Sequence, residues 1–386
     1  MSGKSILVAG CGGNIGSHLL RSLARMPGLG RVTLVDHDVY EPRNVANQDV
    51  LPRDVGKPKV QVQAGRLAEI RPDLEIDAIH APLESLPLGA WRVDLIAACV
   101  DSRAARQTVN ERAWRLGVPW VDSGVLGSEW LARVNVYAPA YDAPCLECAW
   151  SDADYRMLER RYPCGGAGYA PAPNGASAEL GALAAAMLAL ECRKMLAGEM
   201  DRAAVGRQAT IDARWHHLSV TSFRRNKYCR FDHATWRIEP WRCDTRQAHV
   251  ADLLALAETV RVPGQHFVRR LVCSACCGER RLFRLDGSLD AALRRCGGCR
   301  RPMAAPGFDV VESLDRGLPQ AERNQTLEEA GLRYGDVVQA GDRFFEIAAY
   351  VVIGMEKTKP IQALPPVMPA GAAAQAAGGI SLDQKR

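Results

Sequence analysis

A glycine-rich stretch near the start of the chain, VAGCGGNIGSHLL (residues 8–20), constrains the fold more than any other feature. It follows an apolar run at residues 5–10 and leads into residues 14–26, whose apolar side chains recur at helical spacing. Glycines permit a tight turn between such a strand and helix, and they let the backbone and the helix N-terminus approach a phosphate group. We therefore expect a nucleotide-binding turn made by Gly10, Gly12, Gly13 and Gly16.

Strand and helix patterns alternate through the first 140 residues. Further strands are expected at residues 31–36, 93–100 and 118–125, with a helix at 102–116. This alternation predicts an α/β fold with a Rossmann-like, mostly parallel sheet and helices on both faces. Residues 130–139 and 209–223 predict an antiparallel extension of the sheet, and a long alanine-rich helix is expected at 177–196 between them.

The segment VDHDVYEPRNVANQDVLPRDVGKPKV (residues 35–60) separates two kinds of nucleotide chemistry. Asp36 ends the second strand, where a carboxylate binds ribose hydroxyls, and a dehydrogenase would look the same to this point. The segment goes on to carry Asp38, Asn44, Gln48, Lys57 and Lys59, and Asp101 follows at the carboxyl end of a later strand. Adenylation is the attack of a carboxylate on the α-phosphate of ATP. It needs a lysine that neutralises the triphosphate and a carboxylate that holds Mg²⁺, and this segment with Asp101 offers both.

These motifs, taken in order, resemble the ThiF/MoeB and ubiquitin-activating enzyme superfamily over roughly residues 1–235. The resemblance rests on GCGGNIGS, on VDHDVYEPRNVANQ against D-x-D-x-V-x-x-S-N-L-x-R-Q, on DVGKPK, and on DSRAARQTVN against D-N-x-x-x-R. Members activate the C-terminal glycine of a ubiquitin-like or sulfur-carrier protein as an acyl-adenylate. The resemblance implies that Asp36 binds ribose and Asp101 carries Mg²⁺, that Asn44 and Gln48 line the ATP site, and that Lys59 contacts the phosphates.

Other residues of this region leave alternatives open. Asp38 belongs to the expected nucleotide site, although a solvated acidic loop would also place it there, and a plain surface charge explains Lys57 as well as a functional role. The chain departs from the family at Asn47, where an arginine is usual, and the family's helix and arginine ahead of the first strand are missing. Either Arg43 or Arg53 substitutes, or the arrangement of the partner subunit differs, or activity is reduced.

Two groups of cysteines predict zinc sites. Cys145 and Cys148 form one C-x-x-C pair, which alone is ambiguous between zinc and redox chemistry. In the resembled family this pair is half of a structural zinc site. The other half falls on RRNKYCRFDH (residues 224–233), where Cys229 matches and Asp232 replaces the last cysteine, so His233 is expected to complete a Cys₃His site.

A second, independent zinc site is expected further along the chain. Cys273, Cys276, Cys296 and Cys299 form two C-x-x-C pairs separated by 19 residues, which is the pattern of a zinc ribbon. The ribbon is rich in arginine, which suits nucleic acid, but a solvated charged surface is the more common meaning. We therefore expect no nucleic-acid partner.

Cys164, in RRYPCGGAGYAPAP (residues 160–173), is the candidate nucleophile. Family members that form a thioester with their partner place a cysteine in this crossing segment, and Arg160 and Arg161 would favour the reactive thiolate. The alternatives are a loop cysteine without a role and a zinc ligand. Cys11, Cys99 and Cys192 lie on apolar segments and are expected in the core.

The expected organisation has four parts. Residues 1–240 form an adenylation domain with a structural zinc, 241–305 a linker helix and zinc ribbon, 306–355 a small α+β module, and 356–386 a disordered tail. Within the third part, TLEEAGLRYGDVV (residues 326–338) resembles part of a ubiquitin-like fold.

Composition sets the class of protein. The chain has 386 residues, 47% of them hydrophobic, a net charge of +5 and an odd count of 13 cysteines. With no apolar run of membrane-spanning length and no secretory signal, we expect a cytoplasmic protein with free thiols and no membrane partner.

The expected function is ATP- and Mg²⁺-dependent activation of a ubiquitin-like protein by a zinc-containing homodimer, with transfer to Cys164 and then to a conjugating enzyme. Sulfur-carrier adenylation for thiamine or molybdopterin synthesis is the first alternative. A nucleotide-binding adaptor without catalysis is the second, and a dehydrogenase is the last.

Overall fold

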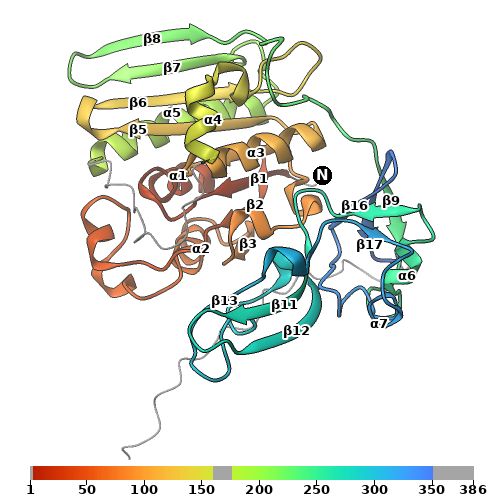
Figure 1. Cartoon of the computed structure of the whole chain (residues 1–386). Coiled ribbons are helices and arrows are strands. Elements are labelled where there is room, and N and C mark those ends of the chain that lie inside the picture. The colour runs from red at the N-terminus through yellow and green to blue at the C-terminus, as the bar shows by residue number, and fades with distance from the viewer. Residues whose placement is uncertain (1–2, 160–175, 351–386) are drawn as a thin grey trace, which may run out of the picture.

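The computed structural model describes residues 3–159 and 176–350, and its larger part is built on an eight-stranded sheet (Figure 1). The strand order is β3-β2-β1-β4-β5-β6-β7-β8. The first five strands in this order run parallel, namely β3 (Glu75–Ile79), β2 (Leu29–Val35), β1 (Lys4–Ala9), β4 (Leu95–Ala98) and β5 (Trp120–Leu126). The predicted Rossmann-like sheet is confirmed.

Helices cover both faces of this sheet. Helices α1 (Asn14–Ala24), α2 (Lys59–Ile70) and α5 (Ala178–Leu196) pack on one face, and α3 (Arg103–Leu116) packs on the other, with α4 (Asp152–Glu159) outside it (Figure 1). Side chains of β1 alternate between the two faces: Ile6 and Val8 join the α1/α5 core, while Leu7 and Ala9 join the α3 core. Since both faces are covered, residues 6–9 of the strand are all apolar and buried, which is typical of parallel sheets.

Three antiparallel strands extend the sheet beyond β5, as predicted. They are β6 (Leu131–Tyr137), β7 (Arg207–Asp212) and β8 (His217–Ser222). Between β6 and β7 the chain passes to the opposite face and forms α5, whose N-cap Ser177 accepts a hydrogen bond from the Leu180 amide at 3.4 Å. No helix in residues 3–159 or 176–350 is long and apolar enough to cross a membrane.

The C-terminal part contains a second sheet with the order β15-β10-β16-β17-β9. Its strands are β9 (Ile238–Arg242), β10 (Thr259–Arg261), β15 (Leu314–Asp315), β16 (Val337–Ala340) and β17 (Arg343–Ala348), and β9 pairs in parallel with β17. Its two α-helices, α6 (Val250–Leu253) and α7 (Gln320–Arg323), have four residues each.

A cysteine-rich ribbon is inserted into this sheet between β10 and β15. It consists of β11 (Phe267–Cys273), β12 (Glu279–Leu285), β13 (Met303–Ala304) and β14 (Val310–Val311), all of which are joined through β11. The segments expected to divide at 240 and 305 therefore share one sheet, because β9, which spans residue 240, and β10 both pair with strands that follow the ribbon. Independent folding of the expected parts, and a ubiquitin-like module among them, stay predictions.

The second sheet is bonded to the larger part through the turns that precede β4. The Gly89 amide donates to the Gly335 carbonyl at 2.8 Å, and Arg92 pairs with Glu346 at 2.7 Å. Arg333 adds a hydrogen bond to the Ser85 carbonyl at 2.7 Å. These contacts fix the C-terminal part against the α3 side of the molecule.

Candidate nucleotide and metal sites

The glycine turn lies where β1 and β4 end side by side, at the point where the strand order reverses. Doubly wound sheets bind nucleotides in this crevice. Gly10 has a positive φ of 75°, and a Cβ there would lie 2.7 Å from the Cys99 carbonyl oxygen. A Cβ on Gly16 would overlap the Gly10 carbonyl oxygen, so α1 can start this close to β1 only with glycine at this position.

Asp36 fixes the conformation of the turn. Its Oδ2 accepts a hydrogen bond from the Gly12 amide at 2.9 Å, and its Oδ1 accepts one from the Asp38 amide at 3.0 Å. A carboxylate has about four acceptor positions, so the two that remain can receive ribose hydroxyls. The residue is buried at the end of β2, which is where the sequence predicted a ribose ligand.

Lys59, the first residue of α2, packs directly on the glycine turn. Only 8% of its side chain is exposed, its stem lies against Gly12, and its Nζ is 3.0 Å from Asp38 Oδ2. Lys57, two residues earlier, has an exposed side chain and pairs with Asp54 at 3.3 Å. The sequence left the role of Lys57 open, and in the structure Lys59, not Lys57, packs on the glycine turn.

Asn44 and Gln48 lie in the loop between β2 and α2. The Asn44 Oδ1 accepts a hydrogen bond from the Glu41 amide at 2.8 Å, which caps a short 3₁₀ helix (Pro42–Ala46). Gln48 has a buried Oε1 with no hydrogen-bond partner among the residues the structure describes. The predicted role of Gln48 at the nucleotide site stays a prediction.

Asp101 follows β4 and is exposed. It makes no hydrogen bond or ion pair with any residue in the described ranges. Asp36, His37 and Asp38 form a closer group, with one ligand atom from each lying within 4.8 Å of the others. Carboxylate ligands for Mg²⁺ are therefore present after β2, at Asp36 and Asp38, and after β4, at Asp101. Asp101 is not part of the group that Asp36, His37 and Asp38 form.

Two contacts of this region were not foreseen from the sequence. Asn47, at the position of the family arginine, donates to the Ala176 carbonyl at 3.2 Å, and Asn14 donates to the Ser177 carbonyl at 3.0 Å. Both side chains hold the start of α5 beside the glycine turn. The signal in the sequence was a departure from the family pattern at Asn47, and for Asn14 only its place in the GCGGNIGS motif.

Arg106, the last residue of the DSRAAR motif, was also given no role. Its Nε lies 2.7 Å from Oδ1 of Asp122, a fully buried carboxylate on β5, and Arg133 of β6 binds the other oxygen at 2.7 Å. The two guanidinium groups compensate the buried charge. This arrangement ties α3 to the sheet just after the predicted magnesium ligand.

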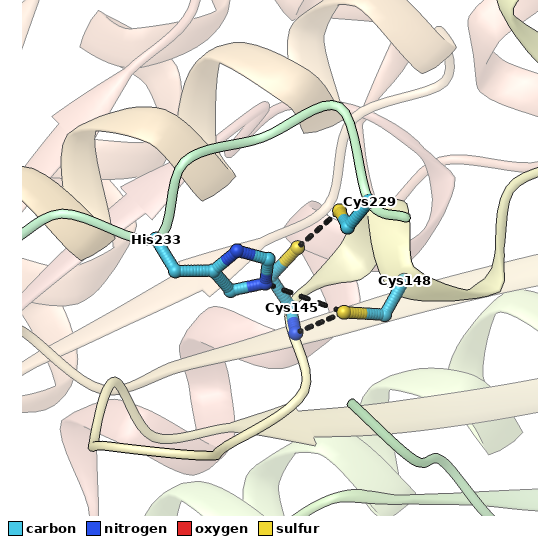
Figure 2. Close-up of side chains that lie close together, drawn as sticks. All are labelled: Cys145, Cys148, Cys229 and His233. Carbon is cyan, nitrogen blue, oxygen red and sulfur yellow. Dashed lines mark hydrogen bonds between the residues drawn. The ribbon is translucent and has the colours of Figure 1, made fainter. Parts of the chain in front are cut away.

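The first cysteine group brings together Cys145, Cys148, Cys229 and His233, as Figure 2 shows. Cys145 Sγ is 3.7 Å from Cys229 Sγ, and Cys148 Sγ is 3.3 Å from His233 Nε2. Zn–S bonds of about 2.3 Å in a tetrahedron place sulfur atoms roughly 3.7 Å apart, so this set fits a zinc ion. Hydrogen bonds from the Cys145 thiol and from backbone amides lower the pKa of Cys148, whereas the hydrogen bond to Cys148 and burial raise the pKa of Cys145.

The residues around this group orient the histidine. His233 Nδ1 is 2.7 Å from the Phe231 carbonyl oxygen, which leaves Nε2 for the metal, and Trp114 packs edge-on against the ring. Asp232 turns the other way and pairs with Arg115 at 2.6 Å. Asp232 stands where the family has its last cysteine, but His233, the next residue, takes the place of that cysteine in the ligand group.

The second group comprises Cys273, Cys276, Cys296 and Cys299, whose sulfur atoms all lie within 4.8 Å of one another. Cys273 is 3.4 Å from Cys299, and Cys276 is 3.4 Å from Cys296. The group joins the two C-x-x-C turns of the ribbon, as the sequence predicted. Four sulfur ligands at these distances fit a zinc ion.

Cys164 lies outside the described residues, so its role as nucleophile stays a prediction. Cys11, Cys99 and Cys192 are buried in the core as expected. Burial raises the pKa of each thiol above its usual value, so these cysteines are poor nucleophiles.

Comparisons with known proteins identify relatives of the N-terminal part of the chain. The ThiF family profile matches residues 1–231. The sulfur carrier protein ThiS adenylyltransferase of Escherichia coli is 29% identical over 152 residues, which cover 39% of this chain and 59% of the relative. The ubiquitin-like modifier-activating enzyme 5 of Bombyx mori is 30% identical over 179 residues, which cover 42% of this chain and 45% of the relative.

A crystal structure of E. coli MccB with ATP is 20% identical, with a TM-score of 0.48, over 59% of this chain and 65% of that chain. The chain spans about half the length of the curated relatives it matches. Because the ThiF profile covers more than half of the residues, including the glycine turn, Asp36, Lys59 and Asp101, the chain belongs to the ThiF family.

Proposed function

We propose that this protein is an ATP-dependent adenylyltransferase that activates the C-terminal carboxylate of a ubiquitin-like or sulfur-carrier protein. The observation that carries the proposal is the buried Lys59, held against the glycine turn by its ion pair with Asp38. A buried cation beside a phosphate-binding turn neutralises the charge of a triphosphate. Two curated relatives, named for the ThiS sulfur carrier and for a ubiquitin-like modifier, support the substrate class.

The proposed step is a displacement at the α-phosphorus of ATP. A carboxylate oxygen of the partner's terminal glycine forms the new P–O bond, the bond to the β-phosphate oxygen breaks, and diphosphate leaves. Asp36 holds the ribose, Lys59 stabilises the charge on the phosphates, and the amides at the start of α1 receive phosphate oxygens. Mg²⁺, bound through Asp101, supplies further charge neutralisation on the triphosphate.

Transfer to Cys164 is the proposed second step, on the basis of the family resemblance. The Cys164 thiolate attacks the acyl carbon, the bond between the acyl group and the phosphate breaks, and AMP leaves. A sulfur-carrier enzyme would instead end at a thiocarboxylate on the partner. A homodimer, a conjugating enzyme and one structural Zn²⁺ in each cysteine group complete the proposal.

The adenylation step is tested by exchange of labelled diphosphate into ATP, with Mg²⁺ and a ubiquitin-like protein that ends in Gly-Gly. Lys59→Ala should lower the exchange rate by about 100-fold, because it removes a charge that stabilises the transition state. Lys57→Ala is the matched control and should keep the wild-type rate, since Lys57 is exposed and paired with Asp54. Equal exchange by wild type and Lys59→Ala would refute the assigned role of Lys59.

The fate of the activated partner is tested on a non-reducing gel. A thiol-sensitive band that is present in wild type and Cys277→Ala but absent from Cys164→Ala would establish the thioester. AMP formation without this band favours the sulfur-carrier outcome. ATP binding without AMP formation, with the partner bound, would favour the adaptor.

A further inference from the structure

The second turn of the zinc ribbon has an unusual sequence, RRCGGCRRP (residues 294–302), with two arginines on each side of its C-x-x-C pair. Its backbone matches that of the first turn. The Cys296 amide donates to the Arg301 carbonyl and the Arg300 amide to the Cys296 carbonyl, both at 2.9 Å. The equivalent bonds in the first turn join Cys273 with Gly278 and Cys277, also at 2.9 Å. The arginines are therefore not required by the fold of such a turn.

Three of these arginines have free guanidinium groups. Arg294 is bound to Asp286 at 2.8 Å and is structural. Arg295, Arg300 and Arg301 are exposed, and none forms a side-chain hydrogen bond or ion pair with another residue in the described part of the chain. We call these three residues the arginine knuckle. The sequence favoured a solvated charged surface here, but it could not show that these charges are unpaired.

The basic charge of the whole protein is concentrated in the ribbon. Residues 267–311 contain nine arginines, no lysine and four acidic residues, a net charge of +5, which equals the net charge of the whole chain. The rest of the chain is therefore close to neutral. A basic patch confined to one module is the electrostatic footprint of a polyanion-binding surface.

The surface of the ribbon favours nucleic acid over an acidic protein. Protein–protein interfaces have an apolar centre, whereas in residues 267–311, all of which the structure describes, Phe308 is the single large exposed apolar side chain, and the Arg270 guanidinium packs over its ring. Protein–nucleic acid interfaces are polar and strongly positive. The tip of the turn is Gly297-Gly298, where an added Cβ on Gly297 would meet nothing within 4 Å, so a phosphate backbone has open access.

We propose that the arginine knuckle binds the phosphate backbone of a nucleic acid. Guanidinium groups form paired hydrogen bonds with phosphate oxygens, and three of them lie on one short turn that its cysteine group holds in shape. Contacts of this kind provide affinity and orientation without reading base sequence. The proposal does not depend on the adenylation site, because the ribbon belongs to the other sheet system.

The test is fluorescence anisotropy of the full-length, zinc-loaded protein with a labelled DNA duplex, single-stranded DNA and single-stranded RNA, each at several salt concentrations. Each phosphate contact contributes about −0.9 to the slope of log affinity against log salt for duplex DNA. Replacing Arg295, Arg300 and Arg301 with alanine should therefore make the slope shallower by about 2 to 3 and weaken binding to all sequences alike. The corresponding three lysine substitutions should keep most of the salt dependence, because they keep the charge.

A matched control removes three exposed, unpaired arginines outside the ribbon, Arg193, Arg242 and Arg316, and should leave binding close to wild type. Zinc content and thermal unfolding, measured for every variant, identify any that lose the ribbon fold. The proposal is overturned if the wild type binds none of the three nucleic acids at low salt, or if it binds poly-glutamate equally well. It is also overturned if the control variant loses as much affinity as the knuckle variant.

Discussion

Asp336 at the contact between the two sheets should make the stability of this protein depend on pH. The residue is 1% exposed, and burial raises the pKa of its carboxyl group to about 6 from a usual value near 4. Its Oδ2 accepts a hydrogen bond from the Arg333 amide at 2.7 Å, while its Oδ1 has no partner among the described residues. The charged groups that face it are the guanidinium of Arg333 on its own turn and that of Arg112 on α3, which lines the same small cavity.

The sign follows from the direction of the shift. A carboxyl group whose pKa is higher in the folded state binds its proton more tightly there, so folding is favoured at low pH and loses stability as the pH rises toward 6. A shift of about two pH units corresponds to about 3 kcal/mol, all of which is lost above pH 7. Asp336→Asn keeps the shape and the acceptor for Arg333 but cannot ionise. At pH 7.5 the variant should therefore be more stable than wild type by up to about 3 kcal/mol, and at pH 5 by roughly half of that.

The measurement is urea unfolding followed by tryptophan fluorescence at pH 5, 6 and 7.5, taken as the difference between variant and wild type. The difference removes any effect of pH on the cysteine groups, which the two proteins share. Asp342→Asn, a substitution on the exposed turn between β16 and β17, is the control and should change stability little at any of these values. A difference for Asp336→Asn that does not vary with pH, or a variant less stable than wild type at pH 7.5, would refute the reasoning.

Three further outcomes are expected. Gly16→Ala should cost about 2 kcal/mol of unfolding free energy by urea titration, because its Cβ overlaps the Gly10 carbonyl, whereas a Cβ on Gly13 lies 3.6 Å from the nearest atom and should be tolerated. His233→Ala should release one of two bound zinc ions in a metal assay, whereas Asp232→Ala should keep both; equal zinc contents would contradict the assignment. Arg106→Met should destabilise by about 3 kcal/mol, since it leaves Asp122 half compensated, whereas Arg103→Met, at an exposed ion pair, should cost less than about 1 kcal/mol.

The sequence by itself determined the architecture of the larger part. Alternation of apolar strands and amphipathic helices requires a covered parallel sheet, and the glycines at positions 10 and 16 require a turn without side chains at the end of its first strand. Two C-x-x-C pairs at short spacing likewise predicted the ribbon. These features are visible in sequence because each depends on residues close together in the chain, or on a pattern that repeats along it.

The tertiary structure decided the features that depend on contacts between distant residues. Lys59 and Lys57 differ only because α2 begins at Lys59 and packs it on Gly12. Asn47 reaches Ala176 across 129 positions of sequence, and no pattern indicated that contact; the contact of His233 with Cys148, across 85 positions, was expected only through the family resemblance. The pairing of β9 with β17 is a further case, because it joins the two sides of the ribbon and no local pattern encodes it. Such pairings depend on how whole helices and strands pack together. The sequence alone does not show which of these elements lie side by side.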